Sequence, residues 1–198
     1  MILTGPEIEK QVKAKKIKIT PFHKKQVNPA SYDLRLGRQV AVYNEAVWTN
    51  DNSPGATVGD GRHFRSWNGG LDAKKEHTLS SFEMDRKVGW LLLPGILYLM
   101  HTEEVIWTAS YVPIIDGKSS IGRLGICVHL TAGFGDPGFN GQYTLEVTTV
   151  HPVRVYPGMR FCQIRFHLME GKVKLYEGNY KGLAARGPVA SRSWKQFA

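Results

Sequence analysis

The stretch "YTLEVTTVHPVRVYPGMRFCQIRFH", residues 143–167, decides the fold class. It contains three short runs rich in Val, Ile, Thr, Phe and Tyr, at 143–149, 153–156 and 161–167. His-Pro and Tyr-Pro-Gly separate these runs, and short β-rich runs bounded by Pro and Gly are typical of strands joined by turns. With a similar run at 126–130, the spacing favours a mainly β fold, either an antiparallel barrel or a jelly-roll-like sandwich.

The first half of the chain continues this β-rich pattern after one expected N-terminal helix. Thr4 can cap that helix, and Pro6 lies in its first turn, where proline is tolerated. Apolar and polar residues nearly alternate over 34–43, as on a half-buried strand. The segment "WLLLPGILYLM", residues 90–100, predicts two short buried strands around a Pro-Gly turn.

A length of 198 residues predicts a single domain spanning 1–198. Two stretches fall outside the regular pattern. Residues 44–87 have a polar, glycine-rich centre without periodicity, which predicts a loop-rich insertion. Residues 179–198 are basic and rich in small residues, and are interpreted either as a frayed end or as a flexible tail that orders over an anion.

The net charge of +9 suggests an anionic partner, such as a nucleotide, a nucleic acid or an acidic surface. No apolar run approaches the ~20 residues that a membrane helix needs, so no membrane partner is expected. The two cysteines, Cys127 and Cys162, provide no disulfide framework and lie in apolar, strand-like contexts. We therefore expect buried free thiols and a reducing, cytoplasmic location.

The segment "DGKSSIGRLG", residues 116–125, brings together residue types that bind phosphate. It is not a P-loop, because the glycine required five residues before Gly117 is replaced by Val112. Lysine, serine and arginine side chains in a glycine-flanked turn could still bind an anion. A short helix cap with surface charges explains the same residues equally well.

The sequence His101-Thr102-Glu103 matches the first half of the zinc deaminase signature, H-x-E. The second half, Pro-Cys-x-x-Cys, is absent from the chain. We therefore expect no zinc, and His101 is interpreted as an ordinary histidine at a strand end.

Two carboxylates in the second half stand out. Asp136 lies in the turn "GFGDPGFNG", where aspartate before Pro-Gly is common for conformational reasons alone. Glu146 lies in the β-rich run "YTLEVTTV", where Leu145 and Val147 would point to the opposite face. Glu146 is either exposed on an edge strand or placed in a site where it can take and give protons.

Five segments in one order resemble the dCTP deaminase branch of the dUTPase superfamily. They are "NPASYDLRLG" (28–37), "DGKSSIGRLG" (116–125), "HLTAGFGDPGFNGQYTLEV" (129–147), "YPGMRFCQI" (156–164) and "GPVASRS" (187–193). The resemblance implies a distorted jelly-roll-like β-barrel with an N-terminal helix, assembled as a homotrimer with sites at the subunit interfaces. It also implies zinc-independent hydrolytic deamination of dCTP, which supplies the synthesis of dUMP and dTTP.

The same resemblance assigns roles to individual residues. Glu146 matches the catalytic glutamate, which deprotonates the attacking water and passes the proton toward the ring. Mg²⁺ is expected to bind through the substrate triphosphate, and no metal is expected on the protein itself. Lys181 and Arg186 lie in a tail about two residues longer than the family pattern. The implied substrate-binding residues are Lys118, Ser119, Ser120, Ile121, Gly122, Arg123, Asp136, Thr144, Leu145, Tyr176, Lys181 and Arg186.

Three functions compete. The first is deamination of dCTP that stops at dUTP and ammonia, and it is favoured because Gly135 replaces a larger apolar residue of the bifunctional pattern. That replacement is expected to loosen Asp136, which would orient the second water. The second is a bifunctional enzyme that forms dUMP, ammonia and pyrophosphate. The third is a non-catalytic nucleotide-binding regulator or nucleic-acid-binding barrel, supported by charge alone, and stable binding of nucleic acid is not expected.

Overall fold

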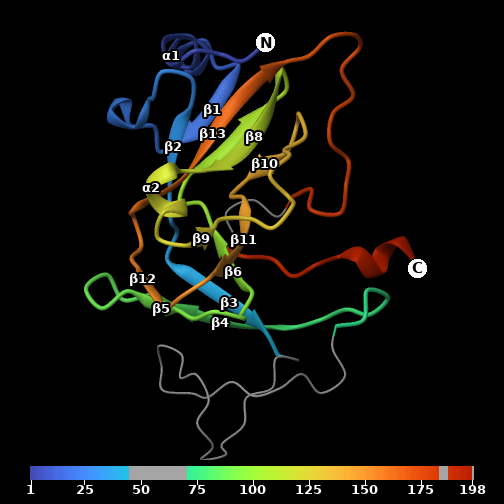
Figure 1. The fold of residues 1–198 in the computed structure, drawn as a ribbon. Coiled ribbons are helices and arrows are strands. Elements are labelled where there is room, and N and C mark those ends of the chain that lie inside the picture. The colour runs from blue at the N-terminus through green and yellow to red at the C-terminus, as the bar shows by residue number, and fades with distance from the viewer. Residues whose placement is uncertain (45–70, 183–186, 198) are drawn as a thin grey trace, which may run out of the picture.

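The computed structural model of the protein describes residues 1–44, 71–182 and 187–197 (Figure 1). This part of the chain is mainly β, with thirteen strands and two short α-helices. None of its helices is long and apolar enough to cross a membrane. The helices are α1 (Gly5–Lys13) and α2 (Ser119–Gly122), with 3-10 turns at η1 (Lys24–Gln26) and η2 (Ser193–Gln196).

The strands are short and pair in an antiparallel manner throughout. In chain order they are β1 (Ile17–Thr20), β2 (Tyr32–Arg35), β3 (Gln39–Tyr43), β4 (Leu79–Glu83), β5 (Trp90–Leu92), β6 (Tyr98–His101), β7 (Val105–Thr108), β8 (Tyr111–Gly117), β9 (Ile126–Cys127), β10 (Asn140–Gly141), β11 (Thr144–Thr149), β12 (Val153–Val155) and β13 (Arg160–Leu168).

In the described residues these strands form four separate sheets. Their orders are β1-β7-β10, β4-β3-β6-β11-β9, β12-β5 and β2-β13-β8. Figure 1 shows β1, β2, β8 and β13 at one end of the molecule and β3, β4, β5 and β12 at the other. The mainly β expectation is confirmed. The expected distorted jelly-roll-like barrel is not found as a closed ring among the described residues, because their strands are divided between four separate sheets.

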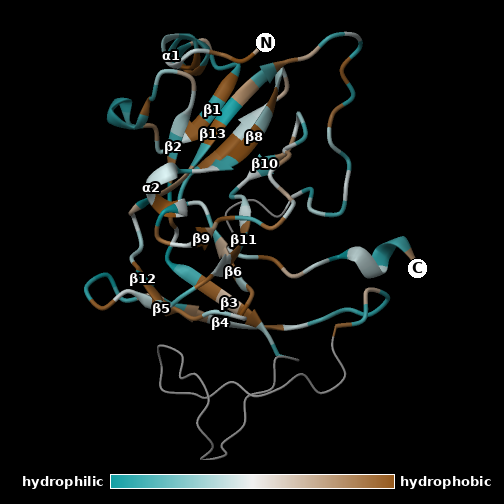
Figure 2. Ribbon diagram, viewed as in Figure 1, coloured by the Kyte–Doolittle hydropathy of each residue, from teal (hydrophilic) through white to brown (hydrophobic). Residues whose placement is uncertain are grey.

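One hydrophobic core nevertheless joins all four sheets. Ile17 of β1, Leu34 of β2, Val40 of β3 and Leu92 of β5 are all buried in a single cluster. Figure 2 shows apolar residues concentrated on the strands, whereas the loops are largely polar. The burial of this shared cluster fixes the sheets relative to one another, since apolar surface removed from water is the main stabilising contribution.

Several sequence-based expectations are confirmed at the level of single elements. The Pro-Gly turn at residues 94–95 separates β5 from β6, and these two strands join different sheets. The expected N-terminal helix is α1, with Ile8 fully buried on its inner face. Thr4 is at the N-cap position but makes no side-chain capping hydrogen bond.

Other expectations are corrected. Cys162 is buried as expected, but Cys127 is exposed, because it lies on the face of the chain opposite to the buried Ile126 and Val128. That the stretch 44–87 is a loop-rich insertion stays a prediction, and within it β4 pairs with β3 over five residues. Residues 45–70 of that stretch lie outside the described part of the chain.

Candidate active site

A cavity of about 650 Å³ lies beside β11. Its wall combines the segment before β10, the start of β11, the loop after β13 and the C-terminal segment. The lining residues are Tyr43, Leu97, Leu99, Leu130, Thr131, Ala132, Phe134, Gly135, Asp136, Phe139, Gln142, Tyr143, Thr144, Glu146, Tyr176, Tyr180, Val189 and Ser191. The volume lies within the range typical of sites for small molecules.

Glu146 faces this cavity because β11 alternates its side chains between core and solvent. Leu145 and Val147 are buried, and Glu146 between them lines the cavity wall. Its Oε2 accepts hydrogen bonds from the backbone N–H of Leu130 at 3.2 Å and of Thr131 at 3.5 Å. These donors orient one carboxylate oxygen and leave the other able to accept a proton.

Asp136 is exposed at the edge of the same cavity, on a turn that β8 holds in place. Gly135 N donates to Pro113 O at 2.8 Å, and Ile115 N donates to Gly133 O at 2.7 Å. These two bonds pair the segment before Asp136 with β8. These bonds therefore fix the backbone that carries the Asp136 carboxylate.

The glycines beside Asp136 leave no empty space, which corrects the expectation that Gly135 loosens this position. An ideal β-carbon on residue 135 would lie 2.4 Å from Tyr143 Oη and 2.9 Å from both Pro113 Cγ and Pro113 O. A β-carbon on residue 133 would lie 2.6 Å from Ile115 O. Glycine is required here by close packing, and the position of Asp136 is constrained as a result.

Three aromatic rings build one side of the cavity. The ring of Phe139 lies 5.2 Å from that of Tyr143 and 5.8 Å from that of Tyr176, measured between centroids. Burial raises the pKa of Tyr143, and the negative charge of Asp136 raises it further. The phenol is therefore neutral at ordinary pH.

The C-terminal segment contributes Val189 and Ser191 to another side of the cavity. Val189 N donates to Thr144 Oγ1 at 3.2 Å, and Ser191 N donates to the hydroxyl of Tyr43 at 2.9 Å. Thr144 thus lies at the cavity as expected, and here it holds the tail. Arg186, which was predicted to contact substrate, lies outside the described residues.

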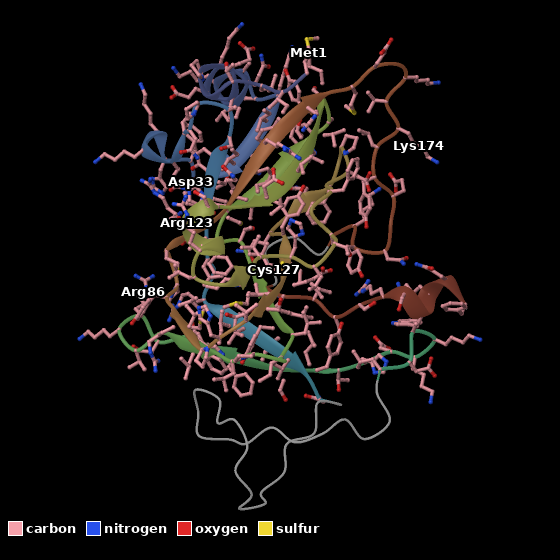
Figure 3. All side chains as sticks on the ribbon, viewed as in Figure 1. Met1, Asp33, Arg86, Arg123, Cys127 and Lys174 are labelled. Carbon is pink, nitrogen blue, oxygen red and sulfur yellow. The ribbon has the colours of Figure 1, made fainter. Side chains whose placement is uncertain are left out.

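The predicted phosphate-binding block lies away from this cavity. None of residues 118–123 lines it. Lys118 Nζ forms an ion pair with Asp33, whose side chain is 2% exposed, so the lysine charge is already engaged within the chain. Ile121 is buried, whereas Arg123 is exposed at the edge of the molecule (Figure 3). The other members of the block, Ser119, Ser120 and Gly122, are also exposed.

The remaining predicted residues are divided between the cavity and other surroundings. Tyr176 lines the cavity, and its hydroxyl accepts a hydrogen bond from Tyr180 N at 3.1 Å. The side chain of Leu145 is buried in the core, on the opposite face of β11. Lys181 forms an ion pair with Glu177 and does not line the cavity.

Sequence reasoning missed Tyr143, Phe139 and Gln142 among the cavity residues. Gln142 could have been found, because it shares the side-chain alternation of Thr144 and Glu146. No comparable signal marks the two aromatic residues, since their place in the wall depends on how the turn before β10 folds back.

His101 has a structural role, in agreement with its interpretation as a strand-end histidine. It is buried at the end of β6, its Nδ1 lies 2.9 Å from Thr102 O, and its Nε2 accepts from Gln39 N at 3.2 Å. Burial lowers the pKa of His101, despite an opposing effect of the hydrogen bond to Thr102. Across the described residues, no group of three or more His, Cys, Asp or Glu side chains is placed to hold a metal ion.

Comparison with known proteins identifies one enzyme family. The family described as dCTP deaminase-like matches residues 2–169. The chain is 41% identical over 198 residues to a protein of Leptospira biflexa named "dCTP deaminase, dUMP-forming", covering 100% of this chain and 98% of that relative. A protein of Cytophaga hutchinsonii with the same name is 42% identical over 182 residues, covering 91% of each chain.

Among solved structures, the fold is similar to a 2'-deoxycytidine 5'-triphosphate deaminase from Agrobacterium tumefaciens. The TM-score is 0.57 and the sequence identity 25%, over 85% of this chain. The match covers 48% of the solved chain, so the present chain spans about half of its length.

These relatives overturn the expectation that the reaction stops at dUTP. They are named as dUMP-forming enzymes, which favours the bifunctional alternative. The physical reason for the error is the packing at Gly135. Gly135 was expected to loosen Asp136, whereas the Tyr143 hydroxyl and Pro113 fill the space beside that glycine.

Proposed function

Because the chain belongs to the dCTP deaminase-like family, we propose that it converts dCTP and two waters to dUMP, ammonia and pyrophosphate. The observation that carries this proposal is the carboxylate of Glu146 in the wall of a cavity of about 650 Å³, with Asp136 at its edge. The names of the dUMP-forming relatives support both steps of the reaction.

Deamination requires a base for one water and a route for its proton. In this proposal, the free oxygen of Glu146 takes a proton from the water that attacks C4 of the cytosine ring. The same carboxylate returns protons to the ring nitrogen and to the departing ammonia. The backbone N–H groups of Leu130 and Thr131 hold the other oxygen and so keep the carboxylate aimed at the ring.

Removal of pyrophosphate requires a second water that attacks the α-phosphorus. Asp136 would orient this water, and the packing of Gly135 against Tyr143 and Pro113 keeps its backbone in place. Mg²⁺ would arrive on the triphosphate and neutralise its charge. The exposed carboxylate of Asp136 offers oxygen ligands of the type that Mg²⁺ prefers, so this part of the cavity fits a metal carried by the substrate.

The phosphate-binding block lies outside the cavity of its own chain, which supports a site shared between copies. Ser119, Ser120 and Arg123 are exposed, and Arg123 has no ion pair within residues 1–44, 71–182 and 187–197. We propose that the protein is a homotrimer in which this block reaches the triphosphate bound by a neighbouring copy. Such head-to-tail contacts form a ring when the rotation from each copy to the next brings the last copy back to the first.

Subunit complementation tests this arrangement. Glu146→Gln and Arg123→Ala, each expected to have low activity alone, are co-expressed with different tags, and purified mixed trimers are assayed for ammonia release from dCTP with Mg²⁺. An intact site then needs its cavity from one variant and its block from the other, so every mixed trimer has one intact site and activity should recover to about a third of the parent's. No recovery would contradict a shared site, and a parent that binds dCTP without releasing ammonia would indicate a non-catalytic regulator.

A further inference from the structure

The C-terminal segment, residues 187–197, is attached to the cavity wall through its backbone. Every second N–H group from residue 187 to residue 191 donates to a side-chain oxygen of that wall. The three bonds are Gly187 N to Gln142 Oε1 at 3.3 Å, Val189 N to Thr144 Oγ1 at 3.2 Å and Ser191 N to Tyr43 Oη at 2.9 Å. Alternate residues of an extended chain face the same side, so a single run of backbone matches three acceptors. Because main-chain groups donate, these bonds do not depend on the side chains of the segment.

Tyr43 accepts the shortest of these three bonds. It is the last residue of β3 and is buried with Ala41 and Leu99 in a small cluster, against which Ala190 packs. Ala190 is therefore held by apolar contact, and Ser191 beside it by a hydrogen bond. Both Tyr43 and Ser191 line the cavity, so losing this bond would loosen one part of the cavity wall.

We propose that Tyr43 is a positioning residue whose hydroxyl keeps the C-terminal segment on the cavity and thereby retains the deaminated nucleotide until its pyrophosphate is removed. This inference rests on the proposed function, because it takes dUTP as an intermediate between two hydrolyses in one cavity. The intermediate still carries the sugar and the triphosphate of dCTP. It leaves the cavity when the segment opens before the second water attacks the α-phosphorus.

This role differs from that of the two carboxylates. Tyr43 acts through the backbone of residue 191 and not on the reacting atoms, so both hydrolyses should remain possible without its hydroxyl. What changes is the competition between opening of the segment and the second hydrolysis. Gln142 and Thr144 still hold the segment, so the loss of one hydrogen bond should alter this competition by about 2–10-fold.

The test measures which nucleotide leaves the protein. Protein in excess is mixed with labelled dCTP, and Mg²⁺ is then added with an excess of unlabelled dUTP, so that labelled dUTP that escapes does not rebind. In Tyr43→Phe, the ratio of labelled dUTP to labelled dUMP should rise about 2–10-fold over the parent. Tyr111→Phe, which removes a tyrosine hydroxyl on β8 outside the cavity, is the matched control and should give the parent's ratio.

A pair of proline variants separates attachment of the segment from direct contact with the nucleotide. Ser191→Pro removes the N–H that donates to Tyr43, whereas Ala190→Pro removes an N–H that has no hydrogen-bond partner in the described part of the chain. Ser191→Pro should raise the ratio at least as much as Tyr43→Phe does, and Ala190→Pro should raise it less. In the Ser191→Pro background, Tyr43→Phe should add nothing.

Two results would overturn the inference. One is the parent's product ratio in Tyr43→Phe. The other is an undiminished effect of Tyr43→Phe in the Ser191→Pro background, because the hydroxyl would then act on the nucleotide itself. The parent's yield of dUMP tests the proposed function separately. If the parent forms no dUMP, hydrogen exchange of the Ser191 amide still tests the attachment: faster exchange in Tyr43→Phe than in the parent supports it, and equal exchange overturns it.

Discussion

The hydroxyl of Tyr143 and the α-carbon of Gly135 are packed so closely that a β-carbon on residue 135 would lie 2.4 Å from Tyr143 Oη. Each residue therefore restricts the other. The turn carrying Asp136 is fixed by an aromatic side chain that precedes the strand of Glu146. This contact therefore connects the turn that carries Asp136 with the residue immediately before the strand that carries Glu146.

Adding a methyl group at this contact should destabilise the protein. We expect Gly135→Ala to lower the free energy of unfolding by about 1–3 kcal/mol, the usual cost of overpacking. In a Tyr143→Phe background the cost should be smaller, because the nearest clashing atom is gone. Denaturant unfolding of the four proteins of this cycle measures both costs. Equal costs in the two backgrounds would show that the hydroxyl does not fill this space.

Replacing Glu146 by Gln should separate binding from chemistry. The amide keeps the shape of the side chain but cannot take a proton from water, so ammonia release should fall by about 10²–10⁴-fold. The dissociation constant for dCTP, measured by calorimetry, should change little. Turnover within tenfold of the parent would exclude Glu146 as the base.

Lys118 and Arg123 belong to one motif but should behave differently when replaced. Lys118→Ala leaves the buried Asp33 with Arg160 as its remaining cationic partner, at 3.5 Å. We expect a lower free energy of unfolding, by less than the ~3–5 kcal/mol of a fully broken buried ion pair.

Arg123→Ala provides the contrast within the same block. Its side chain is exposed and unpaired among the described residues, so stability should stay within about 0.5 kcal/mol of the parent. Its kcat/KM for dCTP should nevertheless fall, because the proposed triphosphate contact is lost. Thermal unfolding and turnover of both variants test the distinction, which fails if Arg123→Ala melts early or retains full activity.

The stability of the fold should decline in mild acid because of His101. Burial lowers the pKa of His101 in the folded state. Near pH 6.5 the unfolded chain therefore binds a proton at this histidine, whereas the folded chain does not. The contribution of neutral His101 to the free energy of unfolding is complete above about pH 6.5. It is lost as the pH falls from there toward the lower pKa of the folded state. Protonated Nε2 could no longer accept from Gln39 N.

Thermal unfolding between about pH 7.5 and 5.5 measures this effect. The parent should lose stability on acidification, and His101→Gln should be less stable at neutral pH but show a shallower decline. Identical pH slopes in the two proteins would assign the acid sensitivity to other groups.

Local sequence patterns predicted the features that depend on a few neighbouring residues, such as turns and the alternation of side chains along a strand. The Pro-Gly turn separated β5 from β6, and the alternation of Leu145, Glu146 and Val147 placed the glutamate opposite the core. Contacts between distant segments were not accessible in this way. Lys118 pairs with Asp33, 85 positions earlier in the chain, and no local pattern indicates this contact.

The cavity itself could not be predicted from the sequence for the same reason. Its wall is assembled from the turn at 130–136, the start of β11 and a tail segment held by Thr144 and Tyr43. The interpretation of Gly135 failed because a glycine in a sequence does not reveal which side chain occupies the neighbouring space. Here that side chain is Tyr143, which no local pattern connects to residue 135.

The central claim, that one cavity carries dCTP through to dUMP, is tested most directly by the ratio of products over time. Parent protein with dCTP and Mg²⁺ is sampled from the earliest turnover, with nucleotides resolved by chromatography and with ammonia and pyrophosphate quantified in parallel. The account predicts dUMP, ammonia and pyrophosphate in equal amounts throughout. Accumulation of dUTP in step with ammonia, without pyrophosphate, would contradict it.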